Sequence, residues 1–219
     1  MDSLSGVGVL DKAMAIVGAL EAGPRSLAEL VEATGLSRAT AHRLAVALEA
    51  HGLLRRGGDG RFGLGLRLIA LGRAAGEALP LVDAARPALE ALRAETGESV
   101  QLFVREGDRR ICLLSLESPH GLRTIVPLGA TLPLDRGSAG AVLRAVPAVV
   151  AKGWAESVAE REAGVASVSA PVHGGDGSLL AALSVSGPVE RTSRAPGRRY
   201  AAAVVRAARV VERALAPAP

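Results

Sequence analysis

Arginine and hydroxyl side chains are concentrated between residues 36 and 73, in a pattern that suits contact with nucleic acid. Seven arginines in this stretch stand against two carboxylates, Glu49 and Asp59, whereas residues 1–35 are net acidic. A guanidinium group can clamp a phosphate or bind guanine through two parallel hydrogen bonds. A basic run is also typical of an ordinary solvated surface, so the elements that position these arginines must decide between the two interpretations.

Capping and helix-breaking residues divide the first fifty residues into three helices. Apolar spacing predicts a first helix over residues 11–22, which a Gly-Pro pair ends. Ser26 lies three residues before Glu29, the spacing of a capping box, so a second helix begins there and ends at Gly35. Ser37 then caps a third helix that continues to about His51.

Two short strands are expected after the third helix, over residues 53–56 and 61–64, around a glycine-rich turn. A helix-turn-helix followed by such a wing, inside the basic part of the chain, predicts a domain that binds double-stranded DNA. The candidate DNA-contacting residues are Ser26, Ser37, Arg38, Thr40, His42, Arg43, Arg55, Arg56 and Arg61.

These candidates have different expected roles. Arg38, Thr40 and Arg43 can reach base edges from the third helix, while His42 and the two capping serines lie nearer to phosphates. Arg43 suits a guanine contact and equally suits a phosphate clamp. The wing arginines are expected to bind phosphates or the minor groove, with surface solubility as the alternative.

The rest of the chain predicts a second domain that mixes helices with antiparallel strands. A linker helix is expected over residues 66–77, then a helix over 82–96 in which Pro87 either introduces a kink or marks the real start. Hairpins over residues 100–116 and 165–186 and an amphipathic helix over 198–215 follow. The fold class is therefore α+β, with a DNA-binding domain at 1–65, a linker at 66–80 and a second domain at 81–219.

The same residues resemble the IclR family of bacterial transcriptional regulators. The matching stretches are Val9 to Ala13, Gly35 to Leu44, Arg61 to Leu68, Ala85 to Glu90 and Ala182 to Pro188. The resemblance covers nearly the whole chain and looks closest to the actinobacterial branch associated with amino-acid metabolism. It implies an N-terminal winged helix-turn-helix, a linker helix and a GAF-like antiparallel-sheet effector domain. It also implies homodimers or homotetramers that bind near-palindromic operator DNA in the cytoplasm, as a repressor or an activator, under control of a small organic acid or an amino-acid-related effector.

Serines on the expected strands are candidates for the effector site. Strand alternation places Ser184 and Ser186 on one face, as it does Ser167 and Ser169, so their hydroxyls can either hold a carboxylate or form a polar face toward solvent. The resemblance favours the first interpretation. The effector-site candidates are Ser138, Ala139, Gly140, Ser157, Ser167, Ser184 and Ser186.

The second domain is expected to be shortened near residues 146–152. Family members carry a helix and loop there, whereas this sequence passes directly from Ala145 through Pro147 to Gly153. A wall of the effector pocket is therefore expected to be missing, and the cavity is expected to open to water on that side.

Enzymatic and membrane functions find little support in the composition. The four histidines lack metal-ligand spacing, Cys112 lies in an apolar strand, and no nucleophile elbow is present, so neither a metal nor another cofactor is expected. No apolar run is long enough for a membrane span, and the first ten residues do not resemble a signal peptide. Two alternatives remain open: a DNA-binding oligomer that needs no effector, and a small-molecule enzyme on a GAF-like fold.

Overall fold

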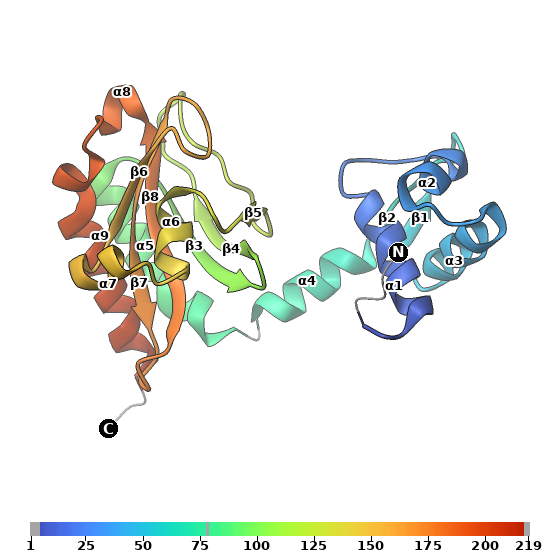
Figure 1. Cartoon of the computed structure of the whole chain (residues 1–219), viewed down its shortest axis with the longest axis horizontal. Helices are drawn as coiled ribbons and strands as arrows, with labels where there is room; N and C mark the ends of the chain where they lie inside the picture. Colours follow the sequence, from blue (N-terminus) through green and yellow to red (C-terminus); the bar gives the residue numbers. More distant parts are fainter. Residues whose placement is uncertain (1–4, 78, 217–219) are drawn as a thin grey trace. The chain divides into compact units, whose positions relative to one another are not determined.

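The computed structural model of the chain describes residues 5–77 and 79–216 (Figure 1). It divides into two compact units, Met1–Ala78 and Leu79–Pro219. Residues 1–4, 78 and 217–219, which belong to the predicted domains or linker, lie outside the described residues. None of the described helices is both long enough and apolar enough to cross a bilayer.

The N-terminal unit contains the predicted helix-turn-helix and wing. Its elements are α1 (Gly8–Ala19), α2 (Leu27–Thr34), α3 (Arg38–Ala50), β1 (Leu54–Arg56), β2 (Phe62–Leu64) and α4 (Arg67–Glu77). β1 and β2 form an antiparallel pair, and Leu20, Leu30, Leu54 and Phe62 lie in the small core that joins them to the helices.

The local signals for α2 and α3 are confirmed. Ser26 and Glu29 form both bonds of the capping box, and Gly35 ends α2 with φ of 67°, a left-handed conformation that glycine adopts without strain. Ser37 caps α3 by accepting a hydrogen bond from the backbone N–H of Thr40. The tight turn between the two helices is therefore fixed at both ends.

The predicted start of the first helix is wrong. α1 begins at Gly8 without a side-chain cap, so Asp11 lies in its first turn rather than at its first residue. The Asp11 carboxylate instead accepts a hydrogen bond from the backbone N–H of Ser5. The helix also ends earlier than predicted, because Leu20 caps it three residues before Gly23.

The start of α4 is bonded to the end of α3. Gly65 N–H donates to the Leu53 carbonyl at 2.8 Å, and Arg67 donates from its backbone to Gly52 and from Nη1 to the His51 carbonyl at 3.0 Å. A Cβ at Gly65 would collide with the Gly52 carbonyl oxygen, so the close approach of the two backbones requires glycine here.

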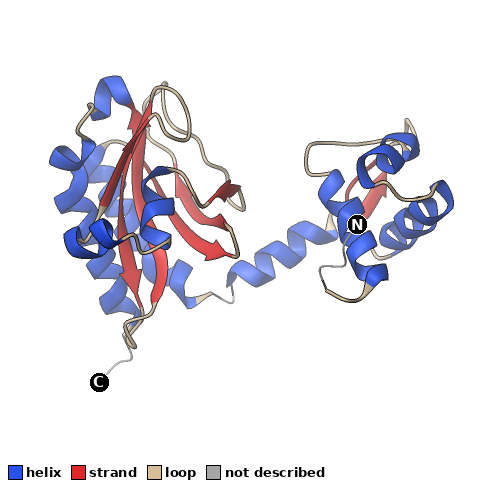
Figure 2. Ribbon diagram, in the orientation of Figure 1, coloured by secondary structure: helices blue, strands red, loops and turns tan. Residues whose placement is uncertain are grey.

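The C-terminal unit is built on one antiparallel sheet of six strands in the order β5-β4-β3-β8-β7-β6, with helices on both faces (Figure 2). Its strands are β3 (Ser99–Glu106), β4 (Arg109–Leu116), β5 (Thr131–Pro133), β6 (Ala155–Val158), β7 (Val165–His173) and β8 (Leu179–Pro188). Its helices are α5 (Pro80–Thr96), α6 (Gly137–Leu143), α7 (Pro147–Lys152), α8 (Val189–Thr192) and α9 (Pro196–Leu215). The α+β class and both predicted hairpins are confirmed.

Two apolar clusters fill the faces of this sheet. α5 and α9 pack on one face, where Leu89, Val204 and Val211 are fully buried. α6 and α7 pack on the other face together with Phe103 and Cys112. Cys112 is completely buried, and this burial raises the pKa of its thiol to about 12.

Of the two alternatives for Pro87, the structure supports a proline inside the helix, because α5 begins at Pro80 and continues through Pro87. The expected direct passage from Ala145 to Gly153 is corrected: Pro147 starts the short helix α7, whose Val149 is buried against the α6 side of the sheet. Pro is well suited to this first helical position, where no N–H is needed.

Candidate functional sites

The exposed face of α3 carries three predicted DNA-contacting side chains. Arg38, His42 and Arg43 are exposed, and among the described residues none of them makes a side-chain hydrogen bond or ion pair. Thr40 is half-buried and its hydroxyl is bonded to that of Ser37 at 2.9 Å. The arginines of α3 are therefore available to an external partner, whereas the two hydroxyl groups serve the helix cap.

The first turn of α3 and the wing border one surface hollow. Arg38, His42 and Arg56 line it together with Leu27 and Phe62. Arg56 lies over the Phe62 ring, 4.4 Å from its centre, and 3.8 Å from the Glu49 carboxylate. The structure thus places Arg38 and Arg56, which lie eighteen residues apart in the sequence, around the same hollow.

The other two wing arginines differ from each other. Arg55 is exposed, and its Nε donates only to the Leu64 carbonyl. Arg61 is half-buried and donates from Nη2 to both oxygens of Glu29, at 2.7 and 2.9 Å, and to the Pro24 carbonyl. Bonds from Ser26 and then from Arg61 lower the pKa of the Glu29 carboxyl to about 2. Arg61 and Ser26 therefore take part in holding α2 and the wing together, and contact with DNA stays a prediction for them.

A second candidate site lies under α6 in the C-terminal unit. Ser138 Oγ, in α6, lies 2.7 Å from the hydroxyls of both Ser167 and Ser169 on β7, and Ser169 lies 2.7 Å from Ser184 on β8. Ser138, Ser169 and Ser184 are buried. The alternative of a polar solvent face is therefore wrong, because α6 covers this face of the sheet.

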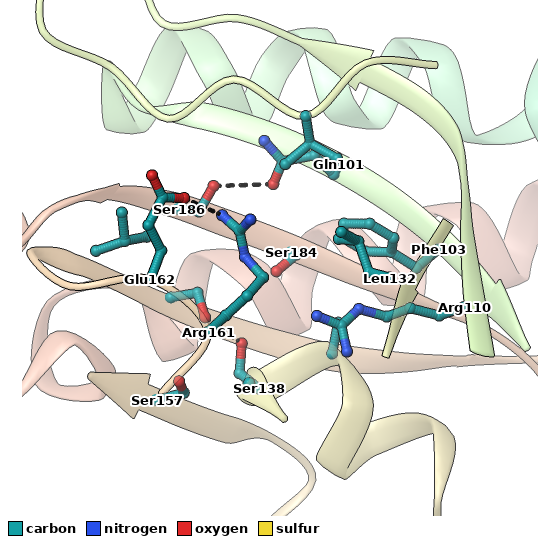
Figure 3. A pocket seen from close by; sticks show the side chains of 15 residues that line it. Gln101, Phe103, Arg110, Leu132, Ser138, Ser157, Arg161, Glu162, Ser184 and Ser186 are labelled. Atoms are coloured by element: carbon teal, nitrogen blue, oxygen red, sulfur yellow. Dashed lines mark hydrogen bonds and ion pairs between the residues drawn. The ribbon is translucent and has the colours of Figure 1, made fainter. Parts of the chain in front are cut away.

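A small cavity opens beside these serines (Figure 3). Six of the seven effector-site candidates line it: Ser138, Ala139, Ser157, Ser167, Ser184 and Ser186. Gly140 does not, and a Cβ there would collide with the Leu134 carbonyl, so its role is close packing. α7 does not line the cavity, whose room of about 30 Å³ holds one or two water molecules.

Sequence reasoning missed the charged residues of this cavity. Arg110 of β4 enters from one side, and Arg161 and Glu162 enter from the loop between β6 and β7 (Figure 3). Gln101 and Phe103 of β3 complete the wall, with Phe103 beside Arg110 and Gln101 beside Ser186. The same hairpin contains Arg105, Arg109 and Arg110, and only the structure shows that Arg110 is buried while the other two are exposed.

Two buried donors in the cavity wall lack partners. Gln101 Nε2 and Arg110 Nε are buried without a hydrogen bond in the described part of the chain. Arg110 is only 3% exposed, and its Nη1 donates to the carbonyls of Pro133 and Arg136. Burial, and then the nearby Arg161 cation, lower the pKa of Arg110 to about 10.

Two family models match the chain, and together they cover most of it. The IclR helix-turn-helix domain matches residues 9–58, and the C-terminal domain of the bacterial transcriptional regulator IclR matches residues 74–148 and 138–213. The chain belongs to the IclR family. It is an IclR-type transcriptional regulator, as the family models and the regulators among its relatives show.

Curated transcriptional regulators align with most of the chain. The glycerol operon regulatory protein of Streptomyces griseus is 28% identical over 242 aligned positions, which cover 94% of this chain and 95% of the relative. The regulator KipR of Bacillus subtilis is 26% identical over 74% of this chain and 78% of its own length. The first alignment is longer than the 219 residues of this chain, so the Streptomyces relative has residues without a counterpart here.

Solved IclR-family structures share the fold. An IclR regulator from Alicyclobacillus acidocaldarius superposes with a TM-score of 0.82 at 22% identity, over 96% of this chain and 99% of that one. An IclR homologue from Microbacterium hydrocarbonoxydans, solved in complex with 4-hydroxybenzoate, gives 0.81 at 21% identity, over 94% and 98%.

Proposed function

We propose that this IclR-family regulator binds operator DNA by inserting the start of α3 into the major groove, with the wing beside it. The observation that carries this proposal is the set of exposed, unengaged side chains on α3: Arg38, His42 and Arg43. Arg43 is assigned to a base edge, and Arg55 and Arg56 of the wing to phosphates. A regulator that contacts chromosomal DNA in this way acts in the cytoplasm, and its role is regulatory rather than enzymatic.

The DNA-binding form is proposed to be a homodimer or a dimer of dimers on a near-palindromic operator. One recognition helix per chain reads one half-site, so two chains are needed for a palindrome. Exposed apolar side chains on α1 and beside or on α4 supply the surface for a second copy: Val9, Leu10, Met14, Leu66, Ile69 and Leu71. Their burial between two copies would remove them from water.

The cavity under α6 is proposed as the effector site, with a small organic acid of amino-acid or carbon metabolism as the ligand. Hydroxyl groups and guanidinium groups around it are donors for a carboxylate. The ligand-bound Microbacterium homologue supports control by a small acid. The small room of the cavity favours a second candidate, in which the C-terminal unit only joins copies of the chain and binds no effector.

Footprinting on the DNA upstream of the protein's own gene tests the first proposal. We expect protection of two half-sites whose centres lie about one helical turn apart, roughly 34 Å. A single unpaired half-site, or no protected sequence, contradicts it. A thermal-shift screen with small carboxylic acids then separates the two candidates, because only an effector-binding regulator gains stability with ligand concentration.

A further inference from the structure

The charges around the cavity do not balance. Its lining contains two guanidinium groups, Arg110 and Arg161, and a single carboxylate, Glu162. Arg161 Nη2 lies 3.1 Å from Glu162 Oε2, so this carboxylate is engaged by the outer arginine. Arg110 is nearly fully buried; the Asp135 carboxylate attracts it, but no carboxylate of the described residues lies within ion-pair distance. A buried cation without an anion is costly, which makes this position receptive to one.

Two residues of the lining hold donors without partners. Arg110 Nε and Gln101 Nε2 are both buried, and neither has an acceptor among the described residues. The Gln101 carbonyl is already used, because it accepts from Ser186 Oγ at 3.0 Å. One or two water molecules in the present space can accept hydrogen bonds but cannot neutralise Arg110. An oxyanion satisfies both requirements.

Arg161 fills the space that a ligand would need. Its side chain extends into the cavity in front of the serines, and its guanidinium lies beside the Glu162 carboxylate (Figure 3). Both residues belong to the loop between β6 and β7. The Glu160 carboxylate holds this loop in place, because it accepts a hydrogen bond from Gly137 N–H at 2.9 Å. The side chains of Arg161 and Glu162 are 24% and 59% exposed, so they can rotate while the loop backbone stays in place.

We propose that the cavity binds an organic dicarboxylate, with one carboxylate on Arg110 and the other on Arg161, while Gln101 is a further donor in the same lining. Glu162 is the internal substitute for the second carboxylate and leaves Arg161 when the ligand binds. Phe103, Val126 and Leu132 form an apolar wall of the cavity for the carbon skeleton between the two acidic groups. This inference rests on the effector site proposed above and specifies its ligand.

The two loop residues are predicted to act in opposite directions. Arg161→Gln removes a ligand partner and is expected to weaken diacid binding about tenfold, since it deletes a charge-assisted hydrogen bond. Glu162→Gln removes the competing carboxylate and is expected to tighten binding several-fold. Arg198→Gln is the matched control, because Arg198 is an exposed arginine of α9 outside the cavity lining.

Calorimetry on the full chain without DNA provides the test. The probes are succinate, glutarate and adipate, each compared with its monoamide, which keeps the length and loses one charge. We expect at least one diacid to bind about tenfold more tightly than its monoamide, and Arg161→Gln to abolish that preference. Arg110→Lys is expected to weaken both members of each pair, and circular dichroism shows whether this variant folds.

Three results would overturn the proposal. The first is that none of the diacids shows saturable binding. The others are that each diacid binds no more tightly than its monoamide, or that Glu162→Gln binds diacids more weakly than the parent protein. If a diacid and its monoamide bind equally well, the cavity is still an effector site but does not prefer dicarboxylates. If no operator DNA is protected in footprinting, only the proposed DNA recognition fails. The failure of this inference is therefore distinguishable from failure of the proposed function.

Discussion

At the scale of single residues, the exposed arginines of α3 and the wing differ in what they already contact. Arg43 is free of partners in the described part of the chain, while Arg56 stacks on Phe62 and lies near Glu49. A free guanidinium loses little when it turns toward a base. Arg56 keeps its stack while it presents its outer edge to a phosphate.

Replacing Arg43 tests the assignment to a base. Arg43→Ala is expected to cost roughly 1–3 kcal/mol of operator binding and to relax preference at one base position. Arg56→Ala is expected to weaken all sequences alike and to reduce the slope of log affinity against log salt by about one. Binding to a randomised operator library at several salt concentrations measures both effects. A uniform loss for both variants would make Arg43 a phosphate contact.

At the scale of elements, a single carboxylate joins the start of α2 to the wing. Glu29 accepts from the backbone of Ser26 and from Arg61, and these bonds hold its pKa at about 2 instead of 4.5. Because the folded state favours the ionised form, the bonds stabilise the N-terminal unit above about pH 4.5, and this stabilisation is lost as the pH falls from 4.5 toward 2.

Glu29→Gln is therefore expected to flatten the acid dependence of unfolding. The amide can still accept from Ser26 but carries no charge for Arg61, so the variant should lose stability at neutral pH and differ little from the parent near pH 2. Thermal unfolding between pH 2 and 7 provides the measurement. Glu32→Gln, on the same helix but without a bond to the wing, is the control. An equal pH dependence for both variants would rule out the proposed coupling.

The elements that the sequence predicted have strong local signals, and those it missed do not. The capping box at Ser26 and the left-handed Gly35 define α2 without help from distant residues. α1 lacks a side-chain cap, so the sequence does not mark its start, and the glycines and alanines of α6 show no helical stripe. The serines of the cavity could be suggested from strand alternation and family resemblance. Arg110 and Arg161 could not, because only the folded sheet brings them together.

At the scale of the whole molecule, the proposed homodimer links exposed apolar surface to function. Ile69 of α4 is 70% exposed, as expected for a side chain that a second copy covers. Ile69→Glu is expected to shift the protein toward monomers and to reduce operator affinity, without lowering the unfolding temperature of the protomer. Sedimentation equilibrium and anisotropy measure the two effects. Leu128→Glu is the control, because Leu128 is 72% exposed in the C-terminal unit. Dimers of undiminished stability in Ile69→Glu would exclude α4 from the interface.

The bonds between residues 51–53, directly after α3, and the start of α4 connect these two helices. Three donors at Gly65 and Arg67 hold the carbonyls of residues 51–53, and the backbone contact at Gly65 leaves no room for slippage. A rotation of α4 is therefore expected to move the end of α3 with it. In the proposed two-fold dimer, such a rotation would change the distance between the two copies of α3. We therefore expect the preferred spacing of the two half-sites, rather than the base preference within each, to respond to changes far from the DNA.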